Sequence, residues 1–345
     1  MTMTIATTPL RLAVVGCGAI AELGHLPGAA RCPDVKVTVL VDRDEARARA
    51  LADMFGVPRV ETDYNALAGL ADAACVALPP HLHRHSAEVL LGAGLHVLME
   101  KPLATSAADA DAMLAAAAAA NRVLAVAMMR RYARSTRYLK DLVASGMLGR
   151  IERYVARSGA ADAWPSRSPF TFNAEQAGGG ALISNGCHDI DLLEWVLGSI
   201  ADLTFYSDSP ARMDGNCLLE CRMASGATAT IEISRTRTLA NSIRIEGTLG
   251  TVDAPLMGET VSILPRGAAP DVLGPANSPP FDYAGVMAAQ LADFAAACRG
   301  ERAPLANARA GRDMLALVER CYAQAKPLVL PWDLPVRGPQ TVAAA

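Results

Sequence analysis

The sequence predicts an α/β protein: an N-terminal Rossmann-type, doubly wound parallel sheet followed by an α+β domain with a large, open, mainly antiparallel sheet. Three observations lead to this prediction. The first part of the chain alternates short apolar runs with helical stretches, the second part contains runs with period-two alternation, and 345 residues are long for one core. We place the boundary between domains 10–127 and 128–335.

The first domain is predicted from apolar runs that are separated by helical stretches. Strands buried on both faces read as continuous apolar runs, so this pattern favours a parallel sheet between helices. The predicted strands are Leu12–Val15, Val35–Val41, Ala73–Leu78, Leu95–Met99 and Val123–Ala127, and the predicted helices are Arg43–Phe55, Leu82–Ala93 and Ser106–Ala120.

The second domain is predicted from alternation of apolar and polar residues, which is typical of an antiparallel sheet with one buried face. Ala227–Ile233 and Ser242–Glu246 show it most clearly. A helix is predicted at Tyr132–Ser145, and three more, expected to cover the apolar face, are predicted at Gly180–Leu197, Tyr283–Arg299 and Ala308–Ala325. Gly258–Pro280 is rich in glycine and proline and is expected to be irregular.

The composition indicates which partners, ligands and locations we expect for this protein. The net charge is −3, with acidic and basic residues interspersed, so we do not expect a nucleic-acid partner. We find no apolar stretch suited to a membrane span and no signal peptide. The eight cysteines show no metal-ligand spacing, so we expect no metal and instead buried, reduced thiols of a cytoplasmic protein.

A glycine turn lies between the first predicted strand and the first helix. Gly16-Cys17-Gly18-Ala19-Ile20-Ala21 follows the dinucleotide-binding pattern, with alanine in the third position. Gly16 permits the tight turn, and Gly18 lets the backbone approach a pyrophosphate. We therefore expect Gly16, Gly18, Ala19 and Ile20 to contact the cofactor; a strand-to-helix turn without a ligand is the alternative.

The ends of the next strands supply further candidate cofactor contacts. Asp42 can accept hydrogen bonds from the adenosine ribose and repels a 2′-phosphate, which favours NAD. Arg43 leaves NADP possible, because an arginine can stack on adenine or pair with that phosphate; a solvated helix start is its alternative role. Pro79 and His83 belong to a strand-to-helix loop on the same edge, where His83 is positioned to touch the cofactor.

The peptide Glu100-Lys101-Pro102 follows the fourth predicted strand, and we expect its three residues to contact the cofactor. A bond before proline can be cis, which would fix the direction of the lysine. A lysine beside a nicotinamide ring suits proton transfer or the polarisation of a carbonyl group. The alternative is a surface lysine in a loop.

A glycine triplet, Gly178-Gly179-Gly180, leads into a predicted helix that carries Ser184 and His188 one turn apart. A histidine titrates near neutrality and can take a hydroxyl proton as the carbon loses hydride. A hydrogen-bonded core residue is the alternative for His188. Asn185 lies beside Ser184 and is a candidate substrate contact.

Several motifs together resemble the glucose–fructose oxidoreductase, inositol dehydrogenase and rhizopine catabolism protein (Gfo/Idh/MocA) family. The resemblance runs in order from about residue 10 to about 333. It is carried by the glycine turn, Pro79-Pro80-x-x-His83, Glu100-Lys101-Pro102, Met129-Arg130-Arg131, the glycine triplet through Gly186-x-His188-x-Ile190-Asp191, and Gly247-Thr248-Leu249-Gly250.

The resemblance implies an NAD(P)-dependent dehydrogenase or reductase acting on the CH–OH group of a sugar, cyclitol or sugar derivative. It implies Lys101 and His188 as catalytic residues at the reacting carbon, and a homodimer or homotetramer formed through the second sheet. Arg130 is expected to help close the cofactor site. Two other functions stay open: a cofactor-binding regulator without net redox turnover, and an NAD-dependent glycosidase.

One position departs from the family pattern. Many polyol dehydrogenases of the family carry an aspartate four residues before the histidine, where this chain has Ser184. A serine can bond a substrate hydroxyl but cannot support an imidazolium by charge. Upstream, Trp164 and Arg167 are candidate substrate contacts, an aromatic ring for a sugar and a guanidinium for an anionic group; a plain loop is equally compatible with that segment.

Overall fold

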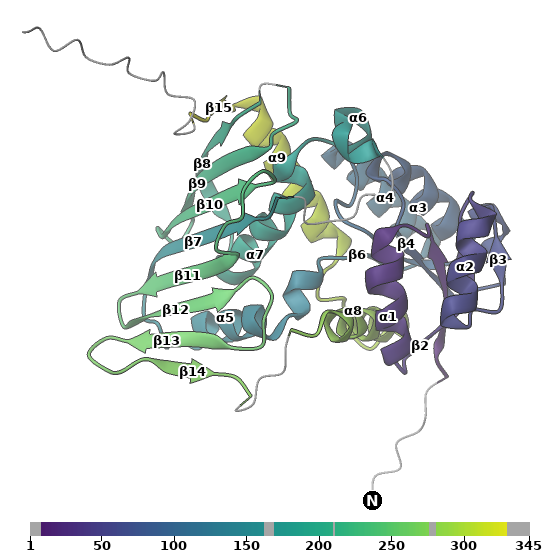
Figure 1. Cartoon of the computed structure of the whole chain (residues 1–345), viewed down its shortest axis with the longest axis horizontal. Coiled ribbons are helices and arrows are strands. Elements are labelled where there is room, and N and C mark those ends of the chain that lie inside the picture. Colours follow the sequence, from purple (N-terminus) through teal and green to yellow (C-terminus); the bar gives the residue numbers. More distant parts are fainter. Residues whose placement is uncertain (1–7, 162–168, 210, 276–280, 330–345) are drawn as a thin grey trace, which may run out of the picture.

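The computed structural model describes residues 8–161, 169–209, 211–275 and 281–329. Two sheets stand side by side, with helices between them (Figure 1). The parallel sheet belongs to the first part of the chain, and the larger sheet forms the opposite wall of the molecule. This arrangement confirms the predicted fold class.

In the described residues, the first sheet is six-stranded and parallel, in the order β3-β2-β1-β4-β5-β6. The order reverses direction between β1 and β4, which is where doubly wound folds bind their ligands. Its strands are β1 Leu10–Val15, β2 Val35–Val41, β3 Val60–Glu61, β4 Ala73–Val76, β5 His96–Met99 and β6 Leu124–Val126, and the helices of this part are α1 Leu26–Arg31, α2 Glu45–Phe55, α3 His83–Gly92 and α4 Ala107–Ala120. The prediction lacked β3, which is only two residues long.

Local chemistry explains why these helices begin and end where they do. Asp44 caps α2 by accepting the N–H of Arg47, and Gly56 ends it in the left-handed conformation. Ser106 caps the alanine-rich helix α4 through the N–H of Asp109. Caps of this kind satisfy backbone groups that have no partner within a helix.

The second sheet is nine-stranded in the described residues, in the order β14-β13-β12-β11-β7-β10-β9-β8-β15. It is mainly antiparallel, although β10 pairs with β7, and β15 with β8, in parallel. Ile231, Ile233, Ile243 and Ile245 are fully buried, as the alternation predicted. The strands are β7 Ile151–Gly159, β8 Ile200–Ser207, β9 Asn216–Met223, β10 Thr228–Ser234, β11 Ser242–Gly247, β12 Gly250–Pro255, β13 Val261–Pro265, β14 Asp271–Leu273 and β15 Lys326–Pro327.

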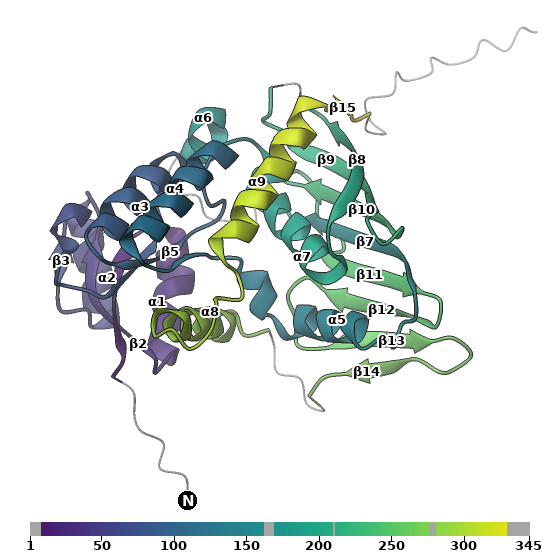
Figure 2. The same ribbon diagram turned by 180° about the vertical axis from the view of Figure 1, so that it is seen from behind.

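The prediction of an irregular segment at residues 258–280 was wrong for part of it. Strands β13 and β14 lie there and pair in register, extending one end of the sheet. Helices α5 (Arg134–Ala144), α7 (Cys187–Leu197) and α9 (Ala308–Ala323) cover the face of this sheet that looks toward the parallel sheet (Figures 1 and 2).

Helix α8 (Tyr283–Cys298) does not cover the second sheet, as the sequence had suggested. It packs on α1, and its Leu291 and Phe294 are buried in the same apolar cluster as Leu12 and Val14 of β1. The parallel sheet and its helices are therefore completed by a helix from much later in the chain, and the boundary at 127/128 stays a prediction. No helix in the described ranges is both long and apolar enough to cross a membrane.

Candidate functional site

The carboxyl ends of β1, β4 and β5 bring three predicted motifs to one edge of the parallel sheet. The glycine turn follows β1, the Pro79 loop follows β4, and Glu100-Lys101-Pro102 follows β5. Gly16 has φ +97°, and a Cβ there would lie 2.6 Å from the Ala77 carbonyl oxygen, so only glycine fits the turn. A Cβ on Gly18 would meet nothing within 4 Å. This open space beside backbone at the start of a helix fits a dinucleotide pyrophosphate.

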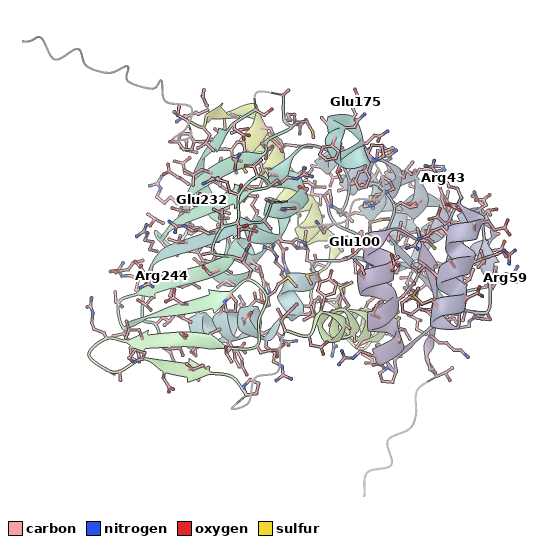
Figure 3. All side chains as sticks on the ribbon, in the orientation of Figure 1. Arg43, Arg59, Glu100, Glu175, Glu232 and Arg244 are labelled. Carbon is pink, nitrogen blue, oxygen red and sulfur yellow. The ribbon has the colours of Figure 1, made fainter. Side chains whose placement is uncertain are left out.

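Asp42 holds the glycine turn in place. Its two carboxylate oxygens accept the backbone N–H groups of Cys17 (2.7 Å) and Asp44 (2.9 Å). Arg43 is exposed at the start of α2, away from the junction of the two halves (Figure 3). Arg47, which the sequence reasoning missed, donates to the Cys17 carbonyl (3.0 Å) and pairs with Glu22 (2.6 Å). The turn is thus fixed on both sides by side chains of the β2–α2 segment.

Lys101 reaches across from the parallel sheet to the second half of the chain. The Lys101–Pro102 bond is cis. The lysine Nζ donates to the Ser184 carbonyl over 2.5 Å. That carbonyl belongs to a π-helical turn, Leu182–Gly186, directly before α7. Such turns depart from regular helical pairing and are frequent at functional sites.

His188 lies in the first turn of α7 and is buried, with 8% of its surface exposed. Burial, together with the positive charges of Lys101 and Arg130, lowers the pKa of His188 well below its usual value. Its Nδ1 is buried without a hydrogen-bond partner among the described residues. Ser184 and Asn185 are partly exposed beside it. The structure thus brings the predicted pair and the two predicted substrate contacts together.

The glycine triplet allows the chain to pass close to the Asp214 backbone at the start of this helical segment. A Cβ on Gly180 would lie 2.3 Å from the backbone nitrogen and oxygen of Asp214, so a side chain is excluded. The Asp214 carboxylate accepts the N–H of Leu182 and the hydroxyl of Tyr322, each at 2.7 Å, and its carbonyl accepts the N–H of Ala181. Asp214, only 1% exposed, was missed by the sequence reasoning; no sequence pattern marks it.

Two arginines fix α7 to the parallel sheet. Arg130 donates to Asp189 (2.7 Å), and Arg131 binds Asp191 through two hydrogen bonds (2.8 and 2.7 Å). All four side chains are largely or fully buried. The sequence predicts one arginine of this pair as a salt-bridged surface residue, whereas in the structure both are salt-bridged and largely buried.

His83 is fully buried rather than open to the cofactor edge. Its Nε2 lies 2.8 Å from the Leu78 carbonyl oxygen, and its Nδ1 lies 3.0 Å from that of Pro102. His83 therefore links the loop after β4 to the loop after β5, a structural role that the sequence reasoning did not assign. Trp164 and Arg167 lie outside the described residues.

Comparison with known proteins gives two matching family models. Residues 10–128 match the oxidoreductase family with an NAD-binding Rossmann fold, and residues 136–253 match the GFO/IDH/MocA C-terminal domain. A dTDP-3,4-didehydro-2,6-dideoxy-alpha-D-glucose 3-reductase of Actinomadura kijaniata is 32% identical over 251 residues, which cover 70% of this chain and 73% of the relative. The chain belongs to the Gfo/Idh/MocA family of oxidoreductases.

Other known proteins are similar to this chain over different lengths. The D-glucoside 3-dehydrogenase of Escherichia coli K12 is 34% identical over 200 residues, 57% of each chain. The solved structure of levoglucosan dehydrogenase with NADH and levoglucosan has a TM-score of 0.82 at 21% identity, covering 92% of this chain and 98% of that one. This likeness shows that the Gfo/Idh/MocA fold extends over nearly the whole molecule.

Proposed function

We propose that this Gfo/Idh/MocA protein is an NAD-dependent dehydrogenase or reductase of a sugar, cyclitol or sugar derivative. The observation that supports this most is the junction of Lys101 with the Ser184 turn, beside His188 and on the sheet edge that also carries the glycine turn. The sugar-directed names of the aligned relatives support the substrate class. When bound, the nicotinamide accepts or gives the hydride.

The residues of the chain handle the hydroxyl proton. His188 is uncharged at neutral pH because its pKa is lowered, so its imidazole is ready to accept a proton. Since Nδ1 is buried, we assign this task to Nε2. Lys101 places an Nζ donor beside His188, where it holds the same substrate oxygen. Ser184 and Asn185 orient neighbouring hydroxyls, so the missing aspartate is compensated by hydrogen bonding rather than charge.

NAD is the cofactor that the site favours. The Asp42 carboxylate stands at the end of β2, bound to two N–H groups, where it disfavours an adenosine 2′-phosphate. Comparison of kcat/KM with NAD and with NADP tests this preference. A clear preference for NADP would assign the exposed Arg43 to the phosphate instead.

We also propose a cytoplasmic homo-oligomer formed through the open face of the second sheet. The eight cysteines are free thiols, which fits a reducing compartment. One face of the sheet is covered by helices, and the other carries charged side chains such as Glu232 and Arg244 (Figure 3). Light scattering of the wild type and of an Arg244→Glu variant tests this proposal; a wild-type monomer would refute it.

The decisive experiment replaces Lys101. With a panel of cyclitols, aldoses and sugar acids and either cofactor, absorbance at the nicotinamide band identifies the substrate. Lys101→Met should then lower kcat by about 10²–10⁴-fold, because a positioned proton donor is lost. Binding of NAD should remain. The control is Lys36→Met, at an exposed position on β2. Near-wild-type turnover of Lys101→Met would overturn the proposed mechanism.

A further inference from the structure

A buried histidine joins the helix of the glycine turn to the peptide of the lysine. The chain leaves the turn through a π-helical segment, Ala21–His25, and His25 at its end has no exposed surface. Its Nε2 lies 2.8 Å from Oε1 of Glu100. The other carboxylate oxygen, Oε2, accepts the backbone N–H of Lys101 over 3.0 Å. One side chain thus connects His25 with the backbone of Lys101.

Glu100 is held at the junction of the two halves (Figure 3), and only 11% of its side chain is exposed. Its backbone N–H donates to Val76 of β4. The titratable groups that face its carboxylate are His25, Lys101, His83 of α3 and Tyr283 of α8. His25 also faces Cys75 of β4. With both oxygens engaged, the carboxylate has a single orientation.

Charge favours this pairing. Burial alone would neutralise both partners. The contacts with Cys75 and Glu100 outweigh burial and raise the pKa of His25 to about 10. For Glu100, burial opposes ionisation, but His25 and Lys101 lower its pKa below the usual value. These pKa shifts favour the charged forms of both side chains at neutral pH, and such a buried pair fixes geometry because either partner alone would be a costly buried charge.

We propose that His25 is a positioning residue for Lys101. Through Glu100 it fixes the Lys101 backbone relative to the helix that carries the cofactor turn, so that the lysine Nζ meets the Ser184 turn and the substrate oxygen. This inference rests on the proposed catalytic role of Lys101. Gly18 and His25 are seven residues apart in the chain. The connection from the backbone of the glycine turn to Lys101 therefore runs through a short stretch of chain and two side chains, those of His25 and Glu100.

The test compares His25→Met, which cannot donate, with His25→Gln, whose side-chain amide can. His25→Met should lower kcat by at least about tenfold, because small misplacements of a reacting group are costly. It should leave the affinity for NAD, measured by fluorescence, nearly unchanged. His25→Gln should recover most of the lost kcat. The control is His85→Met, at an exposed position of α3.

A second readout does not depend on turnover. Hydrogen exchange of the peptide containing Lys101 should be faster in His25→Met than in the wild type, and His25→Gln should restore protection. If His25→Met does not fold, His25→Met/Glu100→Gln leaves no unpaired buried carboxylate and takes its place. Wild-type kcat in His25→Met or in His25→Met/Glu100→Gln, or unchanged exchange in His25→Met, would overturn the inference. If the wild type turns over no substrate of the panel but exchange changes as described, the proposed function fails while the positioning of Lys101 by His25 stands.

Discussion

At the residue scale, two buried histidines of the same site are driven to opposite charge states by their neighbours. His25 faces a carboxylate and a thiol, whereas His188 faces an ammonium and a guanidinium. Neither difference is visible in the sequence, since residue type is identical and the partners lie far away in the chain. These opposite pKa shifts support our proposal that His188 accepts the proton, and they favour the charged form of His25.

We expect His188 to stay uncharged at neutral pH and well into the acid range. Its pKa is lowered by burial and by Lys101 and Arg130, so protonation begins only below the usual 6.5. Nitrogen-15 NMR of labelled histidine, with His188→Asn to assign the signal, measures this directly. An imidazolium signal from His188 at pH 7 would contradict the proposed proton transfer.

The His25–Glu100 pair should make stability depend on pH. The pKa of His25 is raised in the folded state, so its contribution is complete below 6.5 and is lost as pH rises toward about 10. The pKa of Glu100 is lowered, so its contribution is present above 4.5 and is lost only at lower pH. Urea unfolding from pH 5 to 10 should show wild type losing free energy of unfolding above pH 6.5 relative to His25→Met/Glu100→Gln. A difference independent of pH would contradict this.

At the element scale, the start of the α7 segment depends on a close approach of two loops. Gly180→Ala should destabilise the protein by about 1–3 kcal/mol, because the added methyl meets the Asp214 backbone. Tyr322→Phe should cost about 1–2 kcal/mol, since it removes the hydroxyl bound to Asp214. Gly92→Ala, where a Cβ meets nothing, is the control in urea unfolding. Equal stability of Gly180→Ala and Gly92→Ala would show that the approach is not tight.

The same elements show which strands, helices and site residues could be predicted from the sequence and which could not. Periodicity predicted five strands of the parallel sheet, strands β10 and β11 of the second sheet and the helix of His188, because local pattern encodes burial on one face. It missed strand β3, the strands β13 and β14 and the partner Asp214, because short strands and distant contacts leave no periodic pattern. The roles of Lys101 and His188 as catalytic residues remain predictions, which the geometry supports by placing both side chains at one turn.

At the scale of the whole molecule, α8 connects a late segment of the chain to the core of the first sheet. Phe294 is 1% exposed and packs with β1 and α1. Phe294→Ala should therefore destabilise the nucleotide-binding part by about 3–5 kcal/mol. Phe172→Ala, at a side chain that is 76% exposed, is the control. Chemical unfolding followed by tryptophan fluorescence and by circular dichroism measures both, and similar midpoints for the two variants would refute the role of α8.

The late position of α8 has a consequence for how the protein is made. The apolar surface on α1 and β1 leaves the ribosome long before the helix that covers it. Once the last strand of the parallel sheet has been made, residues 128 to 298 still have to follow. At ordinary rates of synthesis this interval lasts roughly 10–30 s. During that time the nascent domain carries an exposed apolar surface. Expression in cells should therefore benefit from chaperones that bind such surfaces. It should also benefit from slower translation of the first third of the chain rather than of the last third.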